Sequence, residues 1–390
     1  MSELNASNLR KEQGNEGPDL VGTTELTSPY YMVPPSGNTA ERPQNPQKGT
    51  LRFNTDIGSL EYFKGDTIGW ESIDRTTPNL GGGTGSNAGV GHRGVFAGGY
   101  TQNSSPYPTT DFIDFITIST LGNAQDFGNL ANAGNVPNEC SSSTRGLFHI
   151  LNGSHVNSTD KIDYVTIAST GDATDFGDLS QSRGGPGNGG CGSSTRGLFG
   201  SGITYSPTSF KDTIDYVTIA QTGNAVDFGN LSVARGDTAA LSSTTRGIWA
   251  GGYTPTHQNV IDYVTIATLG NAADFGDLTR TASRMGSASN STRGLYMGGA
   301  TPTFIDVIDY ITIATLGNAV DFGNLSANRR FPTAVSDPTR AVCYCGEGSP
   351  AISNIIEYVT IASTGNAQDF GDGTDERYSL GGVSNAHGGL

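Results

Sequence analysis

One short pattern of apolar and polar residues recurs along most of this 390-residue chain. Its copy at residues 261–266 reads IDYVTI, and alternate side chains of a strand point to opposite faces. Ile261 and Tyr263 then share one face, and the other face carries Val264 and Ile266. A strand that is apolar on both faces belongs in a sheet that has a neighbour on each side.

The pattern occurs six times, at intervals of about 48 residues. The acidic residues that start the copies are Asp114, Asp163, Asp215, Asp262, Asp309 and Glu357. A DFG triplet follows every copy, and an Arg-Gly pair, replaced by Arg-Ala in the last copy, precedes it. The arginines of these pairs are Arg93, Arg145, Arg196, Arg246, Arg293 and Arg340. The chain is therefore built from six similar units.

Each unit predicts up to four short strands. In one copy they are RGIWAGGY, IDYVTIA, the segment around DFG, and the returning stretch SVARGDTAALSSTT. No segment keeps a 3.6-residue period over ten or more residues, so we expect almost no helix. Helical solenoids of similar period are thereby excluded, and a β-solenoid normally has a shorter repeat. The sequence predicts an all-β fold in which residues 76–390 form a six-bladed β-propeller.

The six repeats begin near residues 89, 141, 192, 242, 289 and 336. A closed ring needs one strand that joins its last blade to its first. Two stretches resemble the returning segment, NLGGGTGSNAGVGHRG at residues 79–94 and SLGGVSNAHGGL at residues 379–390. We expect one of them to supply the closing strand.

Paired glycines after an apolar strand, as in GVFAGGY, GIWAGGY and GLYMGGA, resemble kelch repeats. The whole unit, over residues 89–390, resembles a kelch-like propeller repeat of virion proteins from tailed phages, especially phages of cyanobacteria. This resemblance implies an appendage or tail-fibre protein, exposed on a phage particle.

The N-terminal region differs in composition. Residues 1–48 are polar and then Pro-rich, which predicts an extended arm and linker. Residues 49–75 predict a three-stranded meander that is too small to be stable alone. The meander resembles a small module of phage appendage proteins in its GTLRFNTD, LEY and W elements. The residues that carry this resemblance are Arg52, Phe53, Tyr62 and Trp70.

In such proteins the module is a neck between a virion anchor and a distal domain, often in an oligomer. The resemblance therefore implies that residues 1–48 dock on other virion proteins and that the chain forms a homo-oligomer, with a trimer favoured.

The charge of the chain excludes two classes of partner. The formal net charge is −15 with no cluster of Lys or Arg, so we expect no nucleic-acid binding. No run approaches the roughly 18 apolar residues of a membrane helix, so we expect no membrane insertion. The polar start is no signal peptide.

The four cysteines are interpreted as small apolar core residues. They are Cys140, Cys191, Cys343 and Cys345.

The DFG triplet holds magnesium in protein kinases, but here it has no Gly-rich loop with its lysine and no HRD loop. Six copies at the repeat period indicate a structural feature.

In this structural interpretation, we expect Asp274 to cap backbone N–H groups and Phe275 to pack between blades. Calcium at GDATDFGD, residues 171–178, is the alternative. The five histidines lie at unrelated repeat positions, so the sequence predicts no catalytic, cofactor or metal site.

The recurring arginines need acceptors, because an unpaired buried charge is very costly. We hypothesise ion pairs between them and the strand carboxylates, within or between blades. The candidates are Arg145, Arg196, Arg246, Arg293, Arg340, Asp163, Asp215, Asp262 and Asp309.

The loops after the Gly-rich strands vary between repeats, yet they occupy one repeat position and so share one face. A rigid scaffold with variable loops on one face is typical of a binding surface, although ordinary solvated turns remain the alternative. The candidate recognition residues are Tyr100, Tyr107, Tyr205, Phe210, Tyr253, His257 and Phe304.

Together these features predict a non-enzymatic phage virion protein that displays its propeller toward a host-surface glycan or receptor, or toward another virion protein. Two alternatives stay open. One is a purely structural decoration of the capsid, neck or tail, and the other is a propeller enzyme that degrades polysaccharide.

Overall fold

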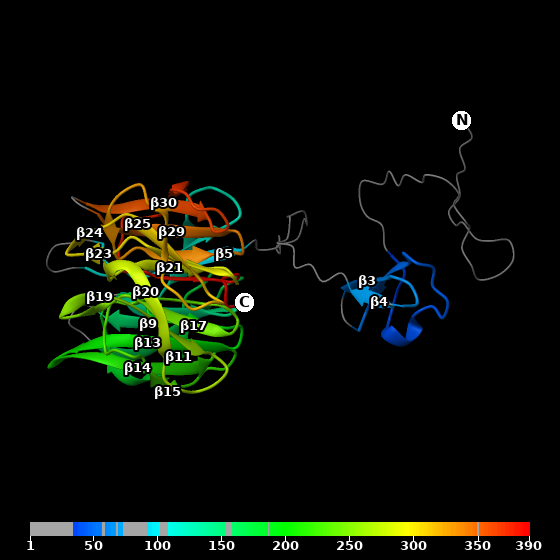
Figure 1. Ribbon diagram of the computed structural model, residues 1–390, viewed down its shortest axis with the longest axis horizontal. Coiled ribbons are helices and arrows are strands. Elements are labelled where there is room, and N and C mark those ends of the chain that lie inside the picture. Colours follow the sequence, from blue (N-terminus) through cyan, green and yellow to red (C-terminus); the bar gives the residue numbers. More distant parts are fainter. Residues whose placement is uncertain are drawn as a thin grey trace. The chain divides into compact units, whose positions relative to one another are not determined.

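The computed structural model describes residues 34–56, 59–67, 69–72, 92–101, 108–152, 158–185, 187–348 and 351–390. Within these ranges every regular element is a strand, apart from one 3-10 turn at Thr39–Glu41, so the all-β prediction is confirmed. No helix in these ranges is long and apolar enough to cross a membrane. The chain divides into two compact units, residues 1–77 and 78–390, coloured blue and cyan to red in Figure 1.

The N-terminal unit contains one four-stranded sheet. Strands β2 (Leu51–Asn54), β3 (Ser59–Phe63) and β4 (Trp70–Ser72) form the antiparallel meander that the sequence indicates. The short strand β1 (Ser36–Gly37) adds to β2 in parallel. The Pro-rich stretch therefore contributes an edge strand that its composition did not indicate.

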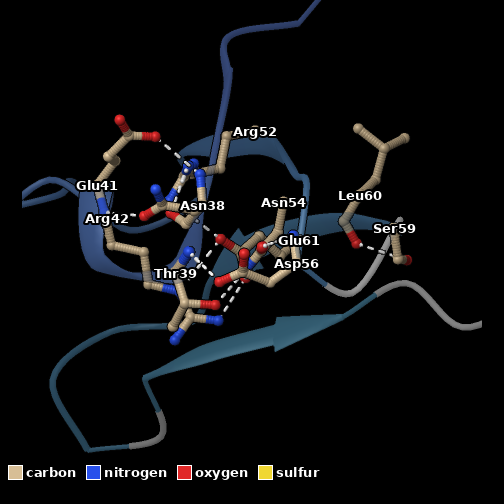
Figure 2. A network of polar contacts seen from close by, with 10 residues as sticks. All are labelled: Asn38, Thr39, Glu41, Arg42, Arg52, Asn54, Asp56, Ser59, Leu60 and Glu61. Carbon is tan, nitrogen blue, oxygen red and sulfur yellow. Dashed lines mark hydrogen bonds and ion pairs between the residues drawn. The ribbon is translucent and has the colours of Figure 1, made fainter.

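A buried carboxylate organises this small unit (Figure 2). Glu61 on β3 is fully buried and accepts hydrogen bonds from Arg42 Nε at 3.1 Å and from Asn54 Nδ2 at 3.1 Å. Arg52 Nη1 lies 3.3 Å from Glu61 Oε1. These contacts, above all the hydrogen bond from Arg42, hold the pKa of Glu61 below its usual range. Hydrogen bonds and ion pairs here compensate for the small apolar core of so short a sheet.

Of the four residues singled out in this module, Arg52 contacts that carboxylate. The guanidinium of Arg52 is 6.0 Å from the Trp70 ring, and Trp70 packs against Phe63 with 5.6 Å between ring centroids. Tyr62 donates its hydroxyl proton to Glu71 at 3.2 Å, and Phe53 is half-buried on β2. Arg52 and Trp70 therefore stabilise the sheet itself.

The C-terminal unit contains six antiparallel sheets built from four main strands each. In strand order they are β32-β5-β6-β7, β8-β9-β10-β11, β12-β13-β14-β15, β16-β17-β19-β20, β21-β22-β25-β26 and β28-β29-β30-β31. The first strands are β32 (Gly381–Ser384), β8 (Gly134–Ser141), β12 (Gly190–Gly192), β16 (Ala239–Ser242), β21 (Gly286–Ser289) and β28 (Thr333–Ser336). The second strands are β5 (Arg93–Ala97), β9 (Arg145–Asn152), β13 (Arg196–Tyr205), β17 (Arg246–Ala250), β22 (Arg293–Met297) and β29 (Arg340–Gly348).

The third and fourth strands complete each sheet. The third strands, which carry the recurring DYV pattern, are β6 (Phe112–Thr117), β10 (Thr159–Thr166), β14 (Thr208–Thr218), β19 (Thr256–Thr265), β25 (Val307–Thr312) and β30 (Ile352–Thr360). The fourth strands are β7 (Gln125–Asn129), β11 (Thr174–Arg183), β15 (Val226–Asn230), β20 (Ala273–Ala282), β26 (Val320–Asn324) and β31 (Gln368–Asp372). Four short strands are added, namely β18 (Tyr253–Thr254), β23 (Ala300–Thr301), β24 (Thr303–Phe304) and β27 (Arg329–Arg330).

The first strands lie next to one another in a ring. β8 contacts β12, and the succession continues through β16, β21, β28 and β32 back to β8. β32 comes from the C-terminal stretch, yet it hydrogen-bonds to β5 of the first sheet, with Gly382 opposite Phe96. Of the two candidate closing segments, the C-terminal one therefore supplies this strand.

The core lies between neighbouring sheets. Ile261 and Val264, on opposite faces of β19, are both buried, as the alternation of this strand predicts. Cys140, Cys191 and Cys343 are buried free thiols within these layers. Burial raises the pKa of all three thiols, which fits small apolar core residues.

The DFG phenylalanine belongs to a stack that recurs in every sheet. Phe275 is buried and meets Tyr263 edge-on, with 5.9 Å between ring centroids. The guanidinium of Arg246 lies 4.9 Å from the centroid of the same Tyr263 ring. The motif thus joins the second, third and fourth strands of one sheet through an Arg–Tyr–Phe stack.

The glycine of DFG allows the next sheet to approach. Gly276 has φ +148°, and a Cβ there would lie 2.5 Å from the carbonyl oxygen of Gly317. The side chain of Asn318 accepts a hydrogen bond from the Asp277 N–H at 3.1 Å. Asp274 is exposed, so its expected role as the capping side chain is wrong. The cap comes from the neighbouring sheet because the two turns lie against each other there.

Candidate functional site

The recurring arginines bind backbone carbonyls of the next sheet. Arg246 Nη1, for example, donates to the carbonyl oxygen of Ile313 at 2.8 Å. The donor and acceptor pairs are Arg93–Ile167, Arg145–Ile219, Arg196–Ile266, Arg246–Ile313, Arg293–Ile361 and Arg340–Ile118. The last pair joins the sixth sheet to the first. The expected ion pairs of these arginines with the strand carboxylates are therefore wrong, because the guanidinium groups turn toward the adjacent sheet.

The strand carboxylates are bound by a second set of arginines, from the returning segments. Arg183 Nη1 lies 2.8 Å from Asp215 Oδ2, and Arg235 Nη1 lies 2.9 Å from Asp262 Oδ2. All four of these side chains are fully buried. The other two pairs are Arg329–Glu357 and Arg377–Asp114. The sequence signal was an arginine at one position of four returning segments, which we did not use.

Two of the six strand carboxylates lack this arginine, because Gly134 and Ala282 occupy its position. Asp163 accepts a hydrogen bond from the Ala131 N–H at 3.3 Å. Asp309 accepts one from Thr279 Oγ1 at 2.7 Å. Burial raises the pKa of both aspartates.

We expect Asp309→Asn to raise the stability of the protein at neutral pH. Because the folded pKa is raised, the folded state holds a proton that the unfolded chain releases, so stability falls as pH rises through the folded pKa. The gain should therefore vanish below about pH 4, where the unfolded aspartate is also protonated. Thermal melting at several pH values measures this change in stability.

Asp262→Asn is the matched control and should destabilise the protein, since Asp262 is paired with Arg235. A gain that is equal at all pH values would contradict the expectation.

The candidate recognition residues fall into three groups. Tyr205, Phe210, Tyr253, His257 and Phe304 are partly exposed. They lie on or beside the hairpins at the end of the unit that Figure 1 shows at β19, β23 and β24, away from the C-terminus. Tyr107 lies outside the described residues.

Tyr100 is fully buried, so its assignment to an exposed recognition loop is wrong. Its ring stacks on Tyr378 with 5.1 Å between centroids, and its hydroxyl donates to Asn135 Oδ1 at 3.0 Å. The returning segment that carries Tyr378 packs on Tyr100, and that contact joins parts of the chain too distant for sequence reasoning.

One position of the returning segment recurs in all six copies and lies at this end. Its residues are Val136, Gly185, Asp237, Arg284, Phe331 and Ser379. The N–H of Arg284 donates to the Asp237 carbonyl, and the N–H of Phe331 donates to the Arg284 carbonyl, both at 2.9 Å. Asp237, Arg284 and Phe331 have φ values of 56°, 63° and 53°, in the left-handed region that is costly for such residues. A repeated, strained backbone therefore presents chemically different side chains.

Arg284 and Phe331 from this position lie in a row with neighbouring aromatic and arginine side chains. We call it the aromatic row, and its members are Phe210, Tyr253, Arg284, Phe331, Arg330 and Phe304. Arg284 lies 5.9 Å from the Tyr253 ring and 5.0 Å from the Phe331 ring. Arg330 lies 5.3 Å from the Phe331 ring and 4.6 Å from the Phe304 ring. Phe210 extends the row, 6.1 Å from Tyr253. The row runs from Phe210 on β14 of the third sheet to Arg330 on β27, which pairs with the sixth sheet.

Carboxylates fix the arginines of the row. Asp237 Oδ2 accepts from Arg284 Nε at 2.9 Å, and Glu347 accepts two bonds from Arg330, at 2.8 and 3.0 Å. Burial raises the pKa of Asp237 despite this partner, and its Oδ1 has no hydrogen-bond partner among the described residues. Burial, followed by the charge of Asp237, raises the pKa of Tyr205.

A groove of about 670 Å³ lies at the Phe304 end of the row. Its walls include Phe304, Asn328, Ser353 and Ile355, from the fifth and sixth sheets. An aromatic ring, an exposed aliphatic side chain and polar amide and hydroxyl groups line it, a composition typical of ligand grooves.

Known proteins do not constrain this site. No protein-family model matches the sequence, and a search of curated proteins found no similar chain. Within the described residues, no group of three or more His, Cys, Asp or Glu is placed to hold a metal ion. The interpretation of the candidate site therefore rests on the aromatic row and the adjoining groove.

Proposed function

We propose that the C-terminal unit is a six-bladed, kelch-like β-propeller and that the chain is a non-enzymatic virion protein of a tailed phage. The propeller is supported by the six successive sheets, by the ring of first strands and by β32, which pairs with the first sheet. In this proposal residues 1–48 dock on other virion proteins, the module at residues 49–75 is a neck, and the chain is a homo-oligomer, with a trimer favoured.

The aromatic row carries the proposed activity, which is binding of a host-surface glycan. Aromatic rings stack on the apolar faces of sugars, and arginine–carboxylate pairs offer hydrogen bonds to hydroxyl groups. Phe210, Tyr253 and Phe304 are partly exposed, so their rings are available for such stacking. The groove beside Phe304 provides room for a further part of the glycan.

Two alternatives remain. A polysaccharide-degrading enzyme would use two free carboxyl groups that flank the scissile bond. Both carboxylates of the aromatic row, Asp237 and Glu347, are bound to arginines, which favours binding over hydrolysis. A purely structural decoration of the capsid, neck or tail would make no use of the row.

We expect the double variant Tyr253→Ala, Phe304→Ala to bind host surface polysaccharide about tenfold more weakly, since each stacked ring contributes about 0.5–1.5 kcal/mol. Binding of the full chain to purified polysaccharide, followed by interferometry, measures this. The melting temperature should stay close to that of the native protein, because both rings are partly exposed.

Leu269→Thr is the matched control. Leu269 is exposed and lies far from the row in the turn before a DFG triplet, where other copies carry threonine. It should bind as the native protein does. Equal binding by the double variant would reject the aromatic row as the glycan site, and no binding by the native protein would favour the structural alternative.

A further inference from the structure

A small cavity lies inside the ring of first strands, at the centre of the C-terminal unit. Its volume is about 50 Å³, and all six first strands line it. Glu139 on β8 is the one carboxylate among its lining residues. The equivalent residues of the other five strands are Gly190, Ala240, Ser287, Ala334 and Gly382. A single acidic side chain thus occupies a position that is otherwise small and uncharged.

Glu139 is almost completely buried, with 6% of its surface exposed. Burial raises the pKa of its carboxyl group well above the usual range, and the backbone N–H of Gly382 near one oxygen offsets this only in part. Its other oxygen, Oε2, has no hydrogen-bond partner among the described residues. The group must be neutralised, either by a proton or by a bound cation, because an uncompensated buried charge is strongly destabilising.

No positive side chain provides that neutralisation, since the lining residues include no Lys or Arg. His387 also lines the cavity, but its protonation is fixed by its bonds. Its Nε2 lies 3.0 Å from the Ser141 carbonyl oxygen and must donate, while Nδ1 accepts from the Gly389 N–H at 3.0 Å. The imidazole is therefore neutral, and burial lowers its pKa.

The serine hydroxyls of the wall already donate their protons to other groups. Ser242, Ser289, Ser336 and Ser384 each donate to the carbonyl oxygen of the preceding first strand at 2.7 to 2.8 Å. Ser287, at the level of Glu139, donates to Ala240 at 2.7 Å. These hydroxyls keep oxygen lone pairs but have no proton left for the carboxylate. The wall therefore offers oxygen acceptors around one negative charge.

Both ends of the ring are covered. Asn188 spans one end, where its side-chain amide donates to the carbonyls of Met285 at 2.9 Å and Pro332 at 3.0 Å. The C-terminal segment covers the other, where the N–H of Gly388 donates to the Ser289 carbonyl at 2.8 Å. The cavity is thus partly shielded from bulk solvent, which strengthens electrostatic attraction inside it.

We propose that this cavity binds one monovalent metal cation, sodium or potassium, on the carboxylate of Glu139. Hard cations take oxygen ligands, and the cavity supplies a carboxylate together with neutral oxygens. One positive charge balances the single carboxylate, whereas a divalent ion would leave a net buried charge. The volume exceeds the roughly 10–15 Å³ needed for one water, so it accommodates an ion with a hydrating water.

Thermal melting of the full chain tests the proposal. Raising sodium or potassium chloride from about 5 to about 200 mM should raise the melting temperature of the C-terminal unit by about 2 °C more than choline chloride does. Choline controls for ionic strength and is too large for the cavity. Sodium NMR provides the second readout, because bound sodium broadens the line until potassium displaces it.

Glu139→Gln keeps the shape of the side chain and removes the charge, so both the metal-specific shift and the line broadening should be lost. Asp126→Asn, which changes an exposed aspartate, should keep both. The same shift in choline as in sodium and potassium, or a metal-specific response that persists in Glu139→Gln, would overturn the proposal. Stabilisation by calcium alone would also overturn it. The titrations of the native protein decide the matter even if Glu139→Gln fails to fold.

Discussion

A chain that ends at Leu380 will lose the cooperative unfolding of the C-terminal unit. This truncation removes β32, which hydrogen-bonds to β5 and lies between the first strands β8 and β28. It also removes Val383, which is buried in the core between the first two sheets. The lost pairing and burial are expected to exceed about 5 kcal/mol, the lower end of the whole stability of a typical domain.

Calorimetry and gel filtration measure this effect. The truncated protein should show no cooperative transition for this unit, and it should self-associate, because the unpaired edge of β5 is exposed. A chain that ends at Ala386 is the matched control. It keeps β32 and loses only the covering segment, so it should unfold cooperatively at a lower temperature. A native-like transition in the shorter chain would show that β32 is dispensable.

The strands and their burial could be predicted because each depends on residues close in sequence. The DYV strand is apolar on both faces, and Ile261 and Val264 are buried on either side of β19. Because the unit occurs six times, the same inference applies to each of the six sheets. Closure was ambiguous because residues 79–94 and 379–390 resemble each other, so local pattern could not choose between them.

The partners of the arginines could not be predicted in the same way. Arg246 and Arg235 both lie near Asp262 in sequence, and only the placement of adjacent sheets decides that Arg235 reaches its carboxylate. Arg246 instead reaches the carbonyl of Ile313 in the next sheet. Charge and spacing restrict the possible partners, but the orientation of a guanidinium depends on packing between sheets.

The candidate binding site shows the same division. Phe210, Tyr253 and Phe304 were identified because they interrupt the repeat in a loop. Arg284 and Phe331 were missed because they lie in the returning segment, which was interpreted as a connection. The same left-handed backbone occurs at Asp237 and Ser379 with different side chains, so a repeated backbone geometry carries side chains that do not repeat. In a repeat protein, positions of constant geometry and variable chemistry are therefore candidates for function.

Replacing Arg235 by Met should destabilise the C-terminal unit by about 3–5 kcal/mol, the usual cost of removing one partner of a buried ion pair. Asp262 would keep its bonds from Ser232, whose Oγ lies 2.6 Å away, but its charge would lose its buried partner. Chemical denaturation of the full chain measures the free energy of unfolding of this unit.

The double variant Arg235→Met, Asp262→Leu separates charge from packing. If the unpaired carboxylate causes the loss, the double variant should recover more than half of it, because an apolar pair of similar volume replaces a buried ion pair at little net cost. Asp309 of the fifth sheet supports this expectation, since Ala282 of the fourth sheet stands at the arginine position and burial raises the pKa of Asp309. An Arg235→Met protein as stable as the native one would contradict it. The arginine would then act as a filler of space, and the four buried pairs would contribute to the choice of partner strands rather than to stability.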